Sequence, residues 1–90
     1  MRLVWRASAR DDLNQILTYI AKRDAVAARS LLGAIQACAE RLPEHPFMHR
    51  SGRVPGTREA VVHPNYLIIY RVRTDSIEIV SIVHARQQYP

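Results

Sequence analysis

The C-terminal half of the chain holds side chains that could cleave RNA without a metal ion. In that reaction the substrate's own 2′-hydroxyl is the nucleophile, so the protein supplies a general base, a general acid and cations for the transition state. The candidate catalytic residues for these tasks are His63, His84, Arg58, Arg86 and Tyr89. His63 and His84 each end an expected strand, so the two imidazoles could share one end of a sheet.

The same segment also suits an ordinary sheet surface. A strand is expected at residues 66–73, and one of its faces carries Tyr66, Ile68, Tyr70 and Val72. Alternation of this kind is typical of a strand packed on a hydrophobic core. Arg71 and Arg73 then alternate outward, as solvated strand residues do. The residues alone leave both interpretations open.

Other chemistries have little support in the sequence. His45 and His49 have the spacing of two zinc ligands on a helix, but Pro46 lies between them in a proline-rich segment. The three glycines form no phosphate-binding loop. No serine, nor the single Cys38, lies in the local signature of a nucleophilic triad. We therefore expect neither a metal nor a cofactor.

The charge of the chain favours an acidic partner. The formal net charge is +5, and only Lys22 among the 13 basic residues is not arginine. Residues 45–58 contain arginines and no acid, which favours partners that bear phosphate or carboxylate groups. A GC-rich genome explains the excess of arginine over lysine, but it does not explain the acid-free stretch. The expected binding residues are Arg50, Arg53, Arg58, Arg71, Arg73 and Arg86.

The length of 90 residues suits one domain that spans residues 1–90. Cys38 is the only cysteine, so an intramolecular disulfide is impossible. The N-terminus lacks the pattern of a signal peptide, and no segment approaches the ~20 apolar residues of a membrane span. We expect a cytoplasmic protein with no membrane partner.

Two amphipathic helices are predicted in the first half of the chain. Ser8 is expected to cap the first helix, over about residues 8–22, with Asp11 at the capping-box position. Apolar residues follow at the i, i+3, i+4, i+7 spacing of one helix face. Asp24 is expected to cap the second helix, which Pro43 ends. The short link between the helices predicts an antiparallel hairpin.

Strand patterns lie on both sides of the helices. A brief first strand is expected at residues 3–5, and three more at 58–62, 66–73 and 77–84. The last three are joined by short links, which predicts an antiparallel meander. The order β-α-α-β-β-β indicates an α+β fold, in which the helix hairpin packs on one face of the C-terminal sheet. We expect the other face to be free for function.

Short motifs along the chain occur in a characteristic order. They are Pro-Gly-Thr-Arg-Glu at 55–59, His-Pro-Asn-Tyr-Leu-Ile-Ile-Tyr-Arg-Val at 63–72 and Val-His-Ala-Arg-Gln at 83–87. A Trp…Ala-x-x-Asp-Leu-x-x-Ile pattern at 5–16 precedes them. Over essentially the whole chain, this set resembles the toxins of the RelE/ParE superfamily. The resemblance implies a growth-inhibiting toxin of a type II toxin–antitoxin pair, a type of system also known for plasmid stabilisation, neutralised by a co-expressed acidic antitoxin.

The superfamily has two modes of action. RelE-like members enter the ribosomal A site and cleave mRNA without a metal, whereas ParE-like members inhibit DNA gyrase. In RelE-like toxins the strand similar to 66–70 carries a central catalytic arginine, where this chain has Leu67. Ala60 stands where another basic residue would lie, while Arg86 matches a late arginine and Tyr89 a C-terminal tyrosine.

Loss of one electrostatic group of this kind commonly lowers the rate about 10²–10³-fold. His63 and His84 could compensate, as histidines do in some ribosome-dependent relatives. The departure therefore favours the ParE-like reading, with a ribosome-dependent mRNA endonuclease as the alternative. A non-toxic nucleic-acid-binding module is a third interpretation, but residues 8–42 contain no basic recognition helix.

Overall fold

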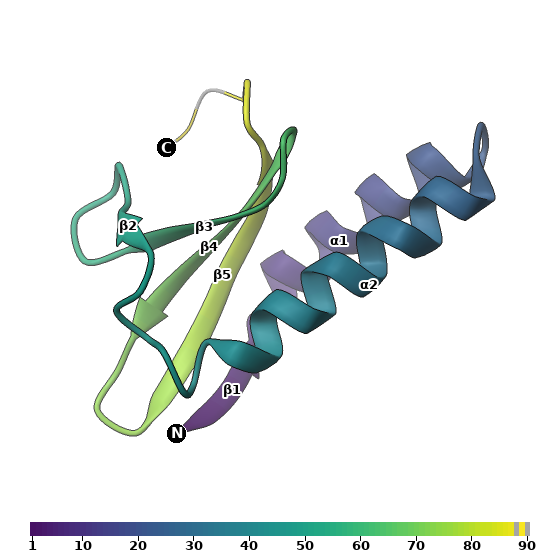
Figure 1. Cartoon of the computed structure of the whole chain (residues 1–90). Coiled ribbons are helices and arrows are strands. Elements are labelled where there is room, and N and C mark those ends of the chain that lie inside the picture. The colour runs from purple at the N-terminus through teal and green to yellow at the C-terminus, as the bar shows by residue number, and fades with distance from the viewer. Residues whose placement is uncertain (88, 90) are drawn as a thin grey trace.

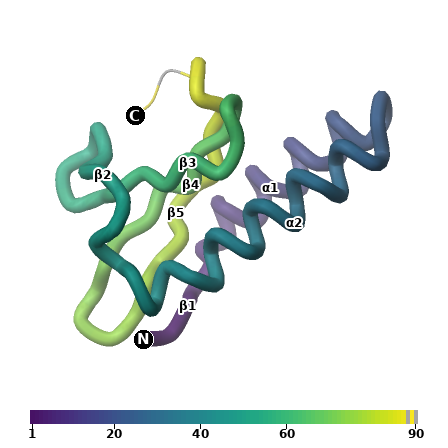
Figure 2. Tube along the Cα trace, viewed as in Figure 1, coloured from purple at the N-terminus to yellow at the C-terminus, as the bar shows by residue number. Residues whose placement is uncertain are grey.

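The computed structural model describes residues 1–87 and residue 89, and it has the predicted α+β architecture (Figure 1). In chain order the elements are β1 (Arg2–Trp5), α1 (Ala7–Ala21), α2 (Ala25–Arg41), β2 (Arg50–Ser51), β3 (Arg58–His63), β4 (Tyr66–Val72) and β5 (Ser76–His84). Both helices lie along one side of the sheet, and the chain then passes through a loop to β2 (Figure 2). Within the described residues, neither helix is long and apolar enough to cross a membrane.

The sheet has the strand order β1-β5-β4-β3-β2. Strands β3, β4 and β5 pair antiparallel, as their short links predicted. Two pairings were not predicted: β1 runs parallel to β5, and β2 pairs antiparallel with β3. The first joins segments more than 70 residues apart and the second involves only two residues, so neither has a local sequence signal.

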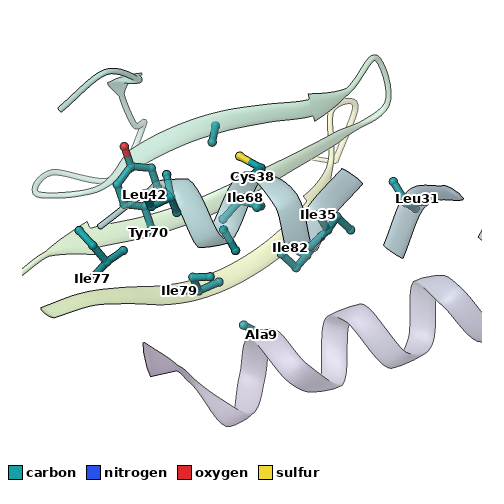
Figure 3. Close-up of a cluster of buried hydrophobic side chains, with 12 residues drawn as sticks. Ala9, Leu31, Ile35, Cys38, Leu42, Ile68, Tyr70, Ile77, Ile79 and Ile82 are labelled. Atoms are coloured by element: carbon teal, nitrogen blue, oxygen red, sulfur yellow. The ribbon is translucent and has the colours of Figure 1, made fainter. Parts of the chain in front are cut away.

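The main core lies between the helices and the sheet (Figure 3). Its fully buried side chains include Ile35 from α2 and Leu42 just past the end of that helix, Ile68 and Tyr70 from β4, and Ile77 and Ile79 from β5. The predicted apolar face of α1, Leu13, Ile16, Leu17 and Ile20, packs against this core. Periodicity therefore identified the buried faces correctly.

The start of α1 differs from the prediction. The helix begins at Ala7, its N-cap is Arg6, and no side chain caps it. Ser8 lies inside the helix and its hydroxyl donates to the carbonyl of Val80 at 2.9 Å. The predicted cap was wrong because a partner from β5, distant in sequence, takes the Ser8 side chain.

The cap of α2 was predicted correctly. The Asp24 carboxylate accepts a hydrogen bond from the backbone N–H of Ala27 at 3.0 Å, which satisfies one of the free donors of the first turn. The helix ends at Arg41, shortly before Pro43. Asp24 thus fixes the turn between the two helices, and the hairpin follows from local signals.

Candidate functional site

The two candidate catalytic histidines lie at the same end of the sheet, on either side of Tyr66. The strand register pairs Tyr66 with His63 on β3 and with His84 on β5. The ring centroid of Tyr66 lies 5.8 Å from that of His63 and 5.2 Å from that of His84. The expectation that the imidazoles share one end of the sheet is therefore confirmed.

Both imidazoles use their Nδ1 atoms to hold the backbone of their own turns. His63 Nδ1 accepts from the N–H of Asn65 at 3.0 Å, and His84 Nδ1 accepts from the N–H of Arg86 at 3.1 Å. In the neutral ring this pattern places the proton on Nε2. The free nitrogen of each neutral ring is then a donor, which suits hydrogen bonding to a partner better than removal of a proton.

The rings of His63, Tyr66 and His84 form a row on the face of the sheet that packs against the helices. Tyr66 packs against the core between the helices and the sheet. A recess of about 360 Å³ lies beside this row. Its walls include His63, Asn65 and Tyr66 from the sheet side and Ile20, Ala27 and Leu31 from the helix side. His63 is exposed at the rim of this recess, on the helix side.

Tyr89 lies on the opposite face of the sheet. Its ring packs against a second buried cluster that consists of Leu67, Ile69 and Val83. The structure therefore divides the candidate catalytic set, with the two histidines on one face and Tyr89 on the other. The second face of the sheet, which we expected to be free for function, is covered in part by Tyr89.

The Arg58 side chain contacts the loop that follows α2. Its Nη1 donates to the carbonyl of His49 at 2.7 Å, and its guanidinium lies 4.9 Å from the ring centroid of Phe47. The neighbouring Tyr70 hydroxyl donates to the carbonyl of Pro46 at 2.8 Å. Burial raises the pKa of Tyr70, with Arg58 acting in the opposite direction, and burial lowers the pKa of His49. The main contact of Arg58 is thus structural.

Two arginines of the acid-free stretch, Arg50 and Arg53, contact the carboxylate of Glu59. Glu59 is only 3% exposed, and its carboxylate accepts hydrogen bonds from Arg50 Nε and from the backbone N–H of Arg53, each at 3.1 Å. Sequence reasoning missed Glu59 because it stands one residue beyond the stretch. Glu59 offsets part of the positive charge and fixes the loop over β3.

The other predicted binding arginines differ in how they are held. Arg73 donates to Glu78 at 2.9 Å, and Arg71 makes a long contact of 3.4 Å with the carbonyl of Pro55. Arg86 is exposed just past the end of β5, where it was expected. The structure brings Arg50, Arg53 and Arg71 around one loop and places Arg86 at the end of the sheet beside His84.

The exposed hydrophobic residues near this loop had no sequence signal. Phe47, Met48 and Val61 are 64%, 63% and 55% exposed. Phe47 and Met48 belong to the loop, and Val61 lies in β3 beyond the part of that strand that pairs with β2. Large apolar side chains next to unpaired strand backbone are typical of a surface that another chain covers.

The architecture defines a small α+β protein, and comparison with known proteins gives its family. Residues 3–89 match the family described as the ParE toxin of the type II toxin–antitoxin system parDE. A protein of Sinorhizobium fredii whose name marks it as a candidate toxin, Y4kP, is 38% identical over 90 residues, covering 99% of this chain and 93% of the relative. Toxin RelE2 of Caulobacter vibrioides is 34% identical over 84 residues, covering 93% and 94%.

The fold has a close match among solved structures. A chain of the chromosomal ParDE system from P. aeruginosa superposes with a TM-score of 0.81 at 22% identity, over 93% of this chain and 95% of that chain. The protein belongs to the ParE toxin family of type II toxin–antitoxin systems. It is thus the toxin of such a pair, in which a toxin is matched with an antitoxin.

Proposed function

We propose that this toxin acts by binding and inhibiting DNA gyrase and not by cleaving RNA. The observation that carries the proposal is the division of the candidate catalytic residues between the two faces of the sheet. His63 and His84 flank Tyr66 on the helix side, whereas Tyr89 packs on the other side. A metal-free ribonuclease needs its base, acid and cations around one phosphate.

The second residue of β4, Leu67, supports the same conclusion. Leu67 is 3% exposed and packs with Ile69 and Val83, so this position holds a buried apolar side chain where a ribonuclease of this superfamily has a cation. Arg58 is no ready replacement for that cation, because its Nη1 atom donates to the loop carbonyls of Phe47 and His49. The outer face has an apolar centre beneath Tyr89 with arginines at its rim, and this composition is common in protein interfaces, so the face is suited to binding a protein once Tyr89 moves away.

A specific similarity favours RNA cleavage as the second candidate. The chain is 34% identical to a protein named toxin RelE2, and its two histidines do lie at one end of the sheet. A ribonuclease built on these histidines would use their Nε2 atoms and the nearby Arg86. The two candidates therefore differ in the residues that they require.

The test compares both activities with the same purified protein. We expect inhibition of gyrase supercoiling, or accumulation of cleaved DNA, and uncut mRNA on programmed ribosomes. The double variant of His63→Ala and His84→Ala should retain the gyrase activity. Codon-dependent cuts in A-site mRNA that disappear in this variant would instead establish the ribonuclease.

We also propose that the antitoxin segment that binds this chain is acidic and amphipathic. The net charge of +5 favours an acidic partner, and the exposed Phe47, Met48 and Val61 favour an apolar one. Co-expression of the toxin with the product of an adjacent gene should yield a stable complex and restore growth. Healthy, high-level expression of the wild-type toxin alone in a sensitive host would contradict this.

A further inference from the structure

Tyr89 covers part of the outer face of the sheet. Leu67, Ile69 and Val83 are each 3% exposed, although both helices lie on the other face (Figure 1). The Tyr89 ring packs against these three side chains. The Arg53 guanidinium lies 4.5 Å from the centroid of that ring, so the ring is held between the sheet and a cation.

The hydroxyl of Tyr89 works against this docked position. It is buried and has no hydrogen-bond partner among residues 1–87 and 89. A hydroxyl buried without a partner loses its hydrogen bonds to water and gains none in return, so it favours release of the Tyr89 side chain. A phenylalanine would have the same apolar ring without this opposing contribution.

Release of Tyr89 would expose a surface of a recognisable kind. Leu67, Ile69 and Val83 would then join Val61, which pairs with Leu67 across the sheet and is 55% exposed. Arg53 would lose its stacking partner and keep its ion pair with Glu59 at 3.9 Å, so a positively charged side chain would remain at the rim. An apolar patch with an arginine beside it is the composition of the energetic centre of many protein interfaces.

We propose that Tyr89 is a displaceable cover over the surface with which this toxin binds gyrase. The inference rests on the proposed function. In the free toxin Tyr89 occupies the apolar patch, and in the complex gyrase side chains replace it. Binding therefore requires the open form, and any change in the population of that form changes the apparent affinity.

The experiment compares Tyr89→Ala, Tyr89→Phe and the wild type in two measurements. The first is the fluorescence of 8-anilinonaphthalene-1-sulfonate, which reports exposed apolar surface, and the second is the concentration that gives half-inhibition of gyrase. Tyr19 provides a matched control, because it also lies under an arginine, Arg23 at 4.8 Å, but is 58% exposed. Circular dichroism checks that each variant is folded.

We expect Tyr89→Ala to increase dye binding and to lower the half-inhibition concentration by about three- to tenfold. Tyr89→Phe should decrease dye binding and raise that concentration by about fivefold, because the closed form gains stability. Tyr19→Ala and Tyr19→Phe should change neither measurement.

Two results would overturn the proposal. Unchanged dye binding in folded Tyr89→Ala would show that Tyr89 covers nothing. Weaker gyrase inhibition by the same variant would show that Tyr89 is itself a contact residue. If the wild type does not inhibit gyrase while the dye results are as expected, Tyr89 does cover the apolar patch, and gyrase as the target is wrong.

Discussion

The carboxylate of Asp12 on α1 accepts a hydrogen bond from the backbone N–H of Ile82 on β5 at 3.1 Å. The same oxygen accepts from the Ser81 hydroxyl at 2.6 Å. Strand β1 pairs only with residues 76–79 of β5, so the edge of β5 beyond them has no strand partner on that side. Asp12 and Ser8, one turn apart on α1, supply the missing partners, and the helix closes the edge.

Asp12→Ala should therefore destabilise the fold by about 1–3 kcal/mol, because it leaves a buried backbone donor without a partner. Asp11→Ala is the matched control, since Asp11 is its exposed neighbour on the same helix and should change stability by less than about 0.5 kcal/mol. Urea unfolding of both variants measures the difference. Equal effects would mean that the Asp12 contact contributes nothing to stability.

Glu59→Gln should loosen the loop that carries Arg50 and Arg53. The substitution retains the shape of the side chain but removes the charge that two arginines and a backbone N–H share. Hydrogen bonds to a charged group contribute about 1.5–3 kcal/mol, so a loss of about 1–2 kcal/mol in unfolding free energy is expected. Glu40→Gln on the exposed side of α2 is the control. Faster amide exchange in residues 50–58 should accompany the loss.

The acid stability of the protein should depend on Glu78. A hydrogen bond from Arg73 lowers the pKa of Glu78, burial raises it to a smaller extent, and Arg6 lowers it further, so that the net shift is below the ordinary value of 4.5. The stabilisation is therefore complete above the ordinary pKa and is lost as the pH falls through the lowered value. Glu78→Gln should reduce the loss of stability between about pH 5 and pH 3, as measured by urea unfolding at each pH. The exposed Glu44→Gln should leave that pH dependence unchanged.

Arg86→Ala should weaken toxicity with little effect on the melting temperature. Arg86 is exposed beyond β5, and exposed substitutions usually change stability by no more than about 0.5 kcal/mol. Growth inhibition in a sensitive host and thermal unfolding of the purified variant test the two parts. Arg29→Ala, at an exposed position on α2, controls for the loss of one positive charge. A large fall in melting temperature would assign Arg86 to the structure and not to function.

Local features of the sequence predicted most of the fold. The apolar spacing of α1 and α2, the Asp24 cap and the alternation in β4 each act over a few residues, so they can be read without knowledge of the partner elements. The position of Arg86 just past the last strand followed from the same kind of signal. The prediction that Ser8 caps α1 was wrong because the partner of its hydroxyl, Val80, is 72 residues away in the sequence.

The sequence by itself determined that His63 and His84 end neighbouring strands, but only the tertiary structure decided which face they occupy. Ala60 and Ile79 both face the main core. If side chains alternated strictly along β3 from Ala60 and along β5 from Ile79, His63 and His84 would lie on the outer face with Tyr89. Register shifts between Val61 and His63, and opposite the Ile69–Tyr70 step, each insert one extra residue. One extra residue reverses the face of every side chain that follows it, so both imidazoles turn toward the helices. Such a shift depends on cross-strand pairing and twist, which no single strand encodes.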